Sequence, residues 1–151
     1  MKRVIPIVIA GLFAAQAVAQ DTAMAEPDPL FVTADMPDLN EFRWKKRPVV
    51  VFADSENDPA YIEQLELLQA RASELRERDV VVLTDTDPAA RNPIRLKLRP
   101  RGFMLTLVGK DGGVKLRKPF PWDVREISRS IDKMPMRQRE IREAKESDQD
   151  S

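Results

Sequence analysis

The chain has 151 residues, room for one domain of ordinary size, and 42% hydrophobic with 33% charged residues is typical of a globular protein. Lys+Arg and Asp+Glu number 25 each, and the chain contains no cysteine and no histidine. Disulfides, thiol nucleophiles, thiolate metal ligands and imidazole bases are therefore excluded. We expect no cofactor, no metal site and no catalytic residue of these classes.

The N-terminus has the layout of a secretory signal peptide. Lys2 and Arg3 precede an uncharged apolar run over residues 4–18, and Ala17 and Ala19 complete a small-x-small cleavage pattern. The run is shorter than the roughly 20 apolar residues of a membrane span. We therefore predict that residues 1–19 are removed, that no membrane span remains, and that the protein is secreted into the bacterial periplasm.

Charge is unevenly distributed along the rest of the chain. Residues 20–38 carry acids and no base, and we expect them to form an extended acidic leader. Residues 54–88 have a net charge of −7 and residues 89–118 a net charge of +8. We expect these two blocks to neutralise each other in part on folding, with a polarised surface as the alternative. Residues 146–151 are polar and are predicted to be a disordered tail, which leaves residues 39–145 as the domain.

The first half of the domain predicts a strand, a helix and a strand. Residues 48–53 form an uninterrupted apolar run, typical of a strand covered on both faces. Asp58 and Pro59 are typical of a helix N-cap and first helical residue, and apolar residues at steps of three and four continue to about Arg78. Residues 80–84 predict a second buried strand. The short connections predict that the two strands are parallel.

The second half predicts two strands and a helix. After a proline-containing loop, residues 103–108 predict a third strand, and the glycines of residues 109–113 predict a tight turn into a half-exposed edge strand at 114–117. A helix is predicted over residues 121–133, with a stop before Pro135 and a short charged helix after it. The order β-α-β and then β-β-α predicts an α/β fold, a mixed sheet flanked by helices.

Several strings resemble one known family. They lie at residues 42–44, Gln64 with residues 67–68, residues 78–79, residues 109–117 and residues 131–137. Over about residues 39–140 the chain resembles the bacterial domain of unknown function 4174, also described as a peroxiredoxin-like DUDES domain. Similar domains occur in animal extracellular proteins, such as sushi-repeat-containing and coiled-coil-domain-containing proteins. The resemblance implies a thioredoxin-like fold and a secreted setting, and it supplies no activity.

The resemblance also implies that this copy is redox-inactive. Thioredoxin-like enzymes place a CxxC motif after the first strand, at the start of the long helix. Here residues 57–60 read Asn-Asp-Pro-Ala, so the proline is present and both thiols are missing.

Basic residues supply the first candidate binding surface. Lys115 and Arg117 share one face of the predicted edge strand, and Lys110 lies in the turn before it. A similar alternation follows the second strand, at Arg95, Lys97, Arg99 and Arg101. Such a face attracts anions, while protection of a sheet edge against aggregation is the competing explanation. Nucleic acid is disfavoured by the export signal and by the few aromatic residues available for stacking.

Two further candidate features lie elsewhere in the sequence. Arg43 and Trp44 precede the first strand, and we expect Trp44 to cover the core, with a partner anchor as the alternative. Met134 and Met136 offer two thioethers that suit copper(I), but a helix stop with core methionines is the preferred interpretation.

Acidic residues supply an alternative site. Asp54, Glu56 and Asp58 follow the first strand, and Asp85 and Asp87 follow the second. The carboxyl ends of parallel strands meet at one edge of the sheet, where open α/β sheets bind ligands. Neither loop has the glycine and glutamate of an EF-hand, and helix capping with strand-end turns is the competing explanation.

The sequence therefore favours a secreted, non-redox, thioredoxin-like binding module. Its expected partner is an envelope protein, a peptide or an anionic polymer. The alternative is a carboxylate- or metal-dependent enzyme at the acidic strand ends. The specific partner and the oligomeric state do not follow from the sequence.

Overall fold

The computed structural model describes residues 29–33 and 38–151. The predicted signal peptide and most of the predicted leader lie outside these residues. The elements are β1 (Phe31–Thr33), η1 (Leu39–Phe42), β2 (Arg47–Phe52), α1 (Pro59–Ala70), α2 (Ala72–Glu77), β3 (Val80–Asp85), η2 (Pro88–Ala90), α3 (Pro93–Leu98), β4 (Met104–Val108), β5 (Val114–Lys118), α4 (Val124–Asp132) and α5 (Pro135–Gln149).

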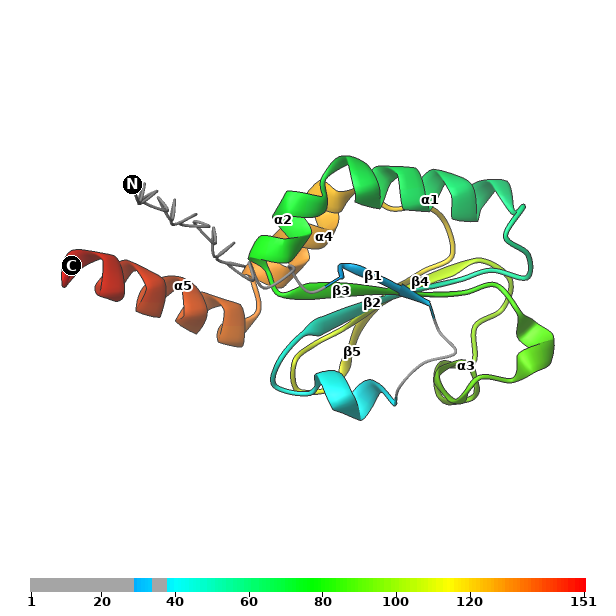
Figure 1. Ribbon diagram of the computed structural model, residues 1–151, viewed down its shortest axis with the longest axis horizontal. Coiled ribbons are helices and arrows are strands. Elements are labelled where there is room, and N and C mark those ends of the chain that lie inside the picture. Colours follow the sequence, from blue (N-terminus) through cyan, green and yellow to red (C-terminus); the bar gives the residue numbers. More distant parts are fainter. Residues whose placement is uncertain (1–28, 34–37) are drawn as a thin grey trace, which may run out of the picture.

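The strands form one mixed five-stranded sheet in the order β1-β3-β2-β4-β5. β1 and β2 each pair parallel with β3, whereas β4 pairs antiparallel with β2 and β5 antiparallel with β4. The parallel β2–β3 pair and the β4–β5 hairpin confirm the predicted order. Helices α1, α2 and α4 cover one face of the sheet, and η1 and α3 lie on the other (Figure 1).

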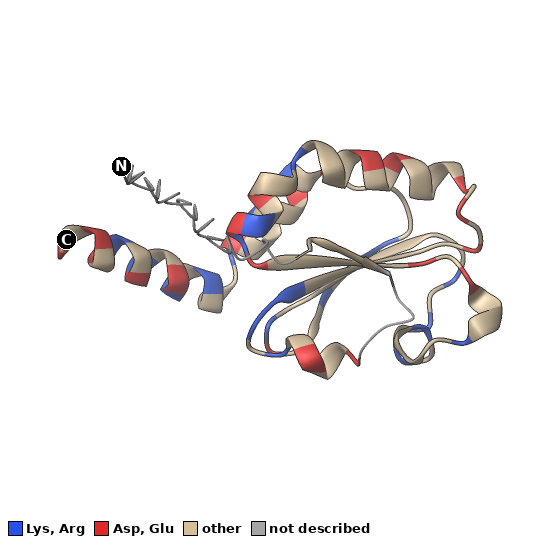
Figure 2. Ribbon diagram, viewed as in Figure 1, with Lys and Arg blue, Asp and Glu red and all other residues tan. Residues whose placement is uncertain are grey.

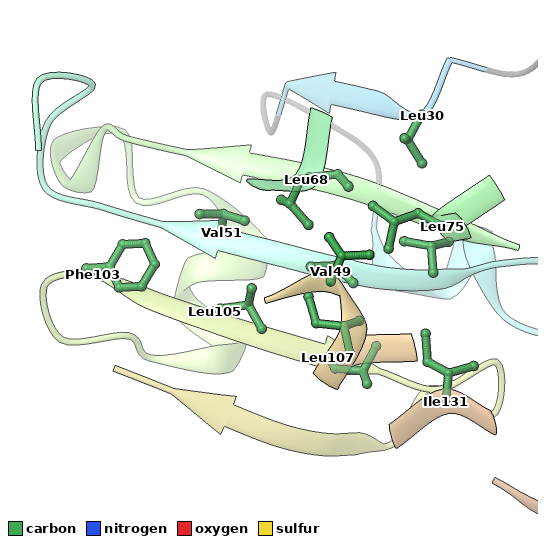
Figure 3. Packing of buried hydrophobic residues seen from close by; sticks show 13 residues of the cluster. Leu30, Val49, Val51, Leu68, Leu75, Phe103, Leu105, Leu107 and Ile131 are labelled. Carbon is green, nitrogen blue, oxygen red and sulfur yellow. The ribbon is translucent and has the colours of Figure 1, made fainter. Parts of the chain in front are cut away.

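The core consists of two hydrophobic clusters, one on each face of the sheet. Successive residues of a strand point to opposite faces, so Val49 and Val51 enter the cluster under the long helices, shown in Figure 3, while Val50 and Phe52 enter the cluster under α3. All four side chains have an exposed fraction of 0%. This double burial is the physical reason why β2 reads as an unbroken apolar run.

Local signals at the start of α1 are confirmed, but the helix is interrupted. Asp58 accepts a hydrogen bond from the Ala60 backbone N–H at 2.9 Å, and Pro59 is the first helical residue. The single helix predicted up to Arg78 is wrong, because Arg71 has a non-helical backbone (φ −128°, ψ 37°) and separates α1 from α2.

Two elements lie where none was predicted, and a third is longer than predicted. β1 is formed by part of the expected leader, with Leu30 beside it buried in the core. α3 lies in the expected loop, and its N-cap Asn92 accepts a hydrogen bond from the Ile94 N–H at 3.0 Å. α5 continues to Gln149, through most of the segment predicted to be a disordered tail.

Helix α5 stands apart from the rest of the fold. It has no fully buried residue and extends away from the sheet (Figure 1). Its contacts with the domain come from its first two turns, and α5 is polar beyond them. Within residues 29–33 and 38–151, no helix combines the length and the apolar character needed to cross a membrane.

Candidate functional site

The β4–β5 turn places Lys110 at one end of the sheet. The turn closes through hydrogen bonds from the Gly109 N–H to the Gly113 carbonyl and from the Gly112 N–H to the Gly109 carbonyl, both at 2.9 Å. Gly112 has φ +83°, a backbone conformation that glycine adopts without steric cost. The Lys110 carbonyl accepts a hydrogen bond from the Trp44 N–H at 2.7 Å, which ties the turn to the segment before β2.

The Lys110 side chain lies between two carboxylates. Its Nζ is 2.8 Å from Asp79 Oδ2 and 2.7 Å from Glu140 Oε1, and the side chain is only 10% exposed. The pairing of Lys110 with Asp79 joins the basic block of the sequence to its acidic block. The expected neutralisation of these blocks therefore occurs at this position.

Glu140 is the residue that fastens α5 to the sheet. It accepts hydrogen bonds from Arg47 Nη2 at 3.0 Å and from Lys110, and Arg137 Nη1 lies 3.4 Å from its second oxygen. Burial alone would raise the pKa of Glu140, but the hydrogen bonds and charges of Arg47 and Lys110 outweigh it and lower the pKa to about 2. Glu140 is therefore ionised at neutral pH.

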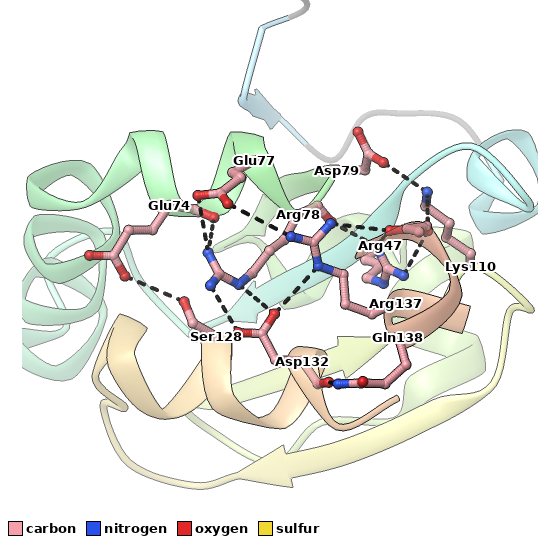
Figure 4. Close-up of polar contacts among 11 residues, drawn as sticks. Arg47, Glu74, Glu77, Arg78, Asp79, Lys110, Ser128, Asp132, Arg137 and Gln138 are labelled. Carbon is pink, nitrogen blue, oxygen red and sulfur yellow. Dashed lines mark hydrogen bonds and ion pairs between the residues drawn. The ribbon is translucent and has the colours of Figure 1, made fainter. Parts of the chain in front are cut away.

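A second cluster joins α2, α4 and α5 beside it (Figure 4). Arg78 donates to both oxygens of Asp132 at 3.0 and 2.9 Å, and Arg137 Nε lies 3.4 Å from Asp132 Oδ1. Burial acts to raise the pKa of Asp132, and these two guanidinium groups lower it below its usual range. The hydrogen bond that Arg78 donates to Asp132 is the largest influence that raises the pKa of Arg78. This cluster is structural and leaves Arg78 fully paired.

A cavity of about 860 Å³ opens beside this network, between β5, α4 and the start of α5. We call it the lysine cavity, because six basic residues and one acidic residue line it. Its lining is Arg47, Gly109, Lys110, Asp111, Lys115, Leu116, Lys118, Trp122, Ser130, Lys133, Met134, Pro135, Met136 and Arg139. Basic and apolar side chains therefore share one concave surface.

Three of the cations in the lysine cavity have no acidic partner within the described part of the chain: Lys118, Lys133 and Arg139. Lys118 Nζ instead lies 4.8 Å from the centroid of the Trp122 ring, a cation–π contact. By contrast, Lys115 pairs with Asp111 at 2.8 Å. The unpaired cations give the cavity an excess of positive charge.

The uncapped start of α5 increases the attraction of this cavity for an anion, and Arg47 leaves one buried donor beside it. The N-cap of α5 is Met134, which makes no side-chain capping hydrogen bond, so the positive end of the helix dipole at the cavity wall lacks a protein cap. Arg47 is 1% exposed and lines the cavity, and its Nε has no hydrogen-bond partner within the described residues. A buried donor without a partner is uncommon in folded proteins.

The structure divides the predicted basic residues. Lys110 and Lys115 line the lysine cavity, but Arg117 points elsewhere and donates to the Leu98 carbonyl. The alternating face predicted for residues 95–101 is wrong, because residues 93–98 form α3 and Arg95 is buried. Trp44 does not cover the core as expected, since it is 60% exposed. Arg43 lies over its ring at 5.3 Å.

Sequence reasoning missed much of the cavity lining. Lys118 lies in β5, Trp122 and Lys133 lie just before and just after α4, and Arg139 lies in α5, so no local pattern joins them. The available signal was the family resemblance, because the lining draws on both of its longer strings, residues 109–117 and 131–137. Met134 and Met136 also lie in the lining, and Met134 packs against the core cluster as well, as expected, while the predicted helix stop at this point is confirmed.

The predicted acidic residues are used mainly for structure. Asp58 caps α1, and Asp87 accepts a hydrogen bond from the Ala89 N–H at 3.1 Å as the cap of η2. Asp85 is buried and pairs with Arg95 Nε at 2.9 Å. Asp54 and Glu56 are exposed.

Three of these five acidic residues still meet at one cavity of about 690 Å³, at the carboxyl ends of the parallel strands. They are Glu56, Asp85 and Asp87, with Tyr61 and Ile62 of α1 nearby. Figure 2 shows acidic ribbon segments in this part of the fold. Among the residues that the structure describes, no group of three or more acidic side chains is arranged to hold a metal ion.

Comparison with known proteins agrees with this fold. Residues 38–140 match the family described as "Domain of unknown function (DUF4174)". The chain belongs to this family. The range corresponds to the 39–140 span on which the sequence resemblance rests, and it contains every residue of the lysine cavity.

Two relatives illustrate the family and the fold. Coiled-coil domain-containing protein 80 of Danio rerio is 29% identical over 133 residues, which cover 68% of this chain and 15% of that protein. A reduced 2-Cys peroxiredoxin of Plasmodium vivax superposes with a TM-score of 0.51 at 16% identity, over 64% of this chain and 81% of that one. The DUF4174 domain of this chain therefore has the thioredoxin-like fold that peroxiredoxins share.

Proposed function

We propose that this DUF4174 domain is an exported, non-redox binding module that holds an acidic peptide segment of a partner protein in the lysine cavity. One observation carries the proposal. Three cations that lack acidic partners in the described chain share one cavity with an apolar wall. The cations are Lys118, Lys133 and Arg139. Pockets that combine apolar walls with a few polar groups are typical ligand sites.

The apolar wall favours a peptide over an anionic polymer. Trp122, Leu116 and the two methionines line the same cavity as the lysines, and a polysaccharide or nucleic acid backbone has no apolar side chain to place against them. An acidic peptide with apolar residues offers both groups. Carboxylates would lie at the cations, and an apolar side chain would lie against Trp122.

The non-redox part of the proposal rests on composition. A thiol-dependent reaction needs a thiolate nucleophile, and the chain has no cysteine. Residues 57–60, at the start of α1, supply a capping aspartate and a proline in its place. Export rests on the signal-like residues 1–19.

A fluorescein-labelled 12-residue peptide of alternating glutamate and leucine tests the proposed function by fluorescence anisotropy. The control peptide has glutamine in place of every glutamate. The acidic peptide should bind, and its affinity should fall as salt rises, because added ions screen charges on a length of about 10 Å at 0.1 M. Equal affinity for the glutamine peptide would contradict the proposal. If neither peptide binds and dextran sulfate binds tightly, the result would instead support an anionic polymer as the ligand.

Matched variants locate the binding. Lys118→Met with Lys133→Met removes two cations that line the cavity, and Lys97→Met with Lys145→Met removes two exposed lysines outside its lining. The first pair should weaken acidic-peptide binding about tenfold, since exposed ion pairs contribute up to about 1 kcal/mol each. The second pair should leave the affinity unchanged. Equal loss in both variants would indicate non-specific attraction.

A further inference from the structure

The most exposed large hydrophobic side chain in the described chain is Trp44. It is 60% exposed, compared with 53% for Phe120 and 50% for Leu96, and it belongs to neither hydrophobic cluster. Tryptophan is enriched among the residues that contribute most to protein interfaces. Its position next to the β4–β5 turn therefore needs an explanation beyond core packing.

The backbone of Trp44 is strained as well. Its φ is +66°, in the left-handed region that disfavours L-residues with bulky side chains and favours glycine. Strained backbone of this kind persists where surrounding structure holds it, and it is concentrated at binding and catalytic sites. A glycine at position 44 would adopt this conformation freely. The backbone conformation at position 44 thus favours glycine over the tryptophan that is present.

The surrounding contacts hold Trp44 in this conformation. Its N–H donates to the Lys110 carbonyl at 2.7 Å, and the next N–H, that of Lys45, donates to the Phe42 carbonyl at 2.9 Å. The Arg43 guanidinium carbon lies 5.3 Å from the centroid of the indole ring. The ring is therefore positioned in advance of binding while most of its surface remains in solvent.

Lys110 connects Trp44 to the lysine cavity. The main chain of Lys110 accepts the Trp44 hydrogen bond, and its side chain lies in the cavity lining. One short turn therefore positions both the exposed indole and a wall of the cavity. The surroundings of Trp44 carry positive charge, as the lysine cavity does, because Arg43 and Lys45 are exposed cations beside Trp44.

We propose that Trp44, with Arg43 stacked on it, is an anchor for the same acidic partner segment outside the lysine cavity. An apolar side chain of that segment packs on the indole ring, and a carboxylate pairs with Arg43. This inference rests on the proposed function, which supplies the partner's chemistry. It adds a second contact point for the partner. It also explains why a tryptophan occupies position 44 in spite of its strained backbone.

The test replaces Trp44 with the residue that the backbone favours. Trp44→Gly should keep or raise the urea midpoint of unfolding, and it should weaken binding of a 24-residue glutamate–leucine peptide at least fivefold. Trp44→Phe, which keeps an aromatic ring, should retain most of the affinity. Leu96→Gln removes an exposed apolar residue of α3 and should change neither quantity.

The outcomes separate this inference from the proposed function. If Lys118→Met with Lys133→Met weakens binding and Trp44→Gly does not, the cavity stands and the Trp44 anchor is overturned. If neither variant weakens binding, both proposals fail. A lower urea midpoint for Trp44→Gly would show that the indole stabilises the fold and would also overturn the anchor. Loss of affinity at an unchanged or higher midpoint supports it.

Discussion

Glu140 Oε1 accepts a hydrogen bond from Arg47 Nη2 at 3.0 Å, although 93 residues separate them in the sequence. Arg47 is the first residue of β2 and is 1% exposed, whereas Glu140 lies on a helix with no fully buried residue. A buried guanidinium needs a compensating anion, and this carboxylate supplies it. The same carboxylate also binds Lys110 of the β4–β5 turn. Glu140 therefore links the position of α5 to the stability of the sheet.

Replacing Glu140 with glutamine should destabilise the domain by about 2 kcal/mol, a typical value for hydrogen bonds to charged groups. The glutamine keeps the shape of the side chain but leaves the charge of Arg47 without its anion. Urea unfolding followed by circular dichroism measures the change. Glu143→Gln, at an exposed position of the same helix, is the control and should change stability by less than about 0.5 kcal/mol. Equal stability of the two variants would contradict the structural role of Glu140.

The lowered pKa of Glu140 predicts a loss of stability in acid. Its folded pKa of about 2 lies below that of a free glutamate, so the folded state favours the ionised form. The resulting stabilisation is fully present above the unfolded pKa of about 4.3 and disappears as pH falls toward 2. Between these values, the stability of the wild type should decrease toward that of Glu140→Gln. A constant difference between the two proteins from pH 5 to pH 2 would contradict the assignment.

Asp85 should behave as a structural residue and not as a catalytic one. It is buried and pairs with Arg95, whose Nη2 also donates to the Ala53 carbonyl at 2.9 Å. Asp85→Asn leaves a buried guanidinium uncompensated and should destabilise the domain by about 3 kcal/mol. Asp54→Asn, in the exposed loop after β2, should leave stability within about 0.5 kcal/mol. An unchanged melting temperature for Asp85→Asn would reopen the acidic strand ends as a candidate active site.

The local parts of the fold were predictable because their signals lie within a few residues of one another. Asp58 and Pro59 predict the start of α1, and the glycines of residues 109–113 predict the hairpin turn. α3 was missed although Asn92 and Pro93 have the same capping pattern, because Pro88, Pro93 and Pro100 together favoured a loop. The alternating basic residues of positions 95–101 do not form one exposed face, because Arg95 points inward and pairs with Asp85.

The lysine cavity was only partly predictable for a different reason. Its lining comes from β5, α4 and α5, and the relative placement of those elements depends on long-range pairs such as Arg47 with Glu140. Trp44 shows the same limit. Large aromatic residues are mostly buried, whereas the left-handed φ of Trp44, its bond to the Lys110 carbonyl and its contact with Arg43 accompany an exposed ring.

The proposed export signal, residues 1–19, makes a prediction about the mature chain. Expression in a bacterium with a working secretion system should yield periplasmic protein whose intact mass begins at Gln20. An Ala17→Leu with Ala19→Leu variant removes the small residues that signal peptidase accepts and should retain residues 1–19. Intact mass spectrometry of both proteins measures the difference. Cytoplasmic wild-type protein that keeps residues 1–19 would contradict the predicted location.

Gly109 should control the charge pattern at the mouth of the lysine cavity. A Cβ at this position would lie 2.5 Å from Lys115 Cε and 2.8 Å from Asp111 Oδ1, so Gly109→Ala must displace these flexible side chains. The hydrogen bond from Lys115 is the largest cause of the lowered pKa of Asp111. In Gly109→Ala this pKa should therefore rise toward its ordinary value, as measured by carboxyl NMR titration.

Gly112→Ala is the control, because a Cβ there meets nothing within 4 Å but its φ of +83° is unfavourable for alanine. That variant should lose about 1 kcal/mol of stability and keep the Asp111 pKa low. An unchanged Asp111 pKa in Gly109→Ala would contradict this prediction. It would show that Lys115 and Asp111 stay paired when a methyl group occupies position 109.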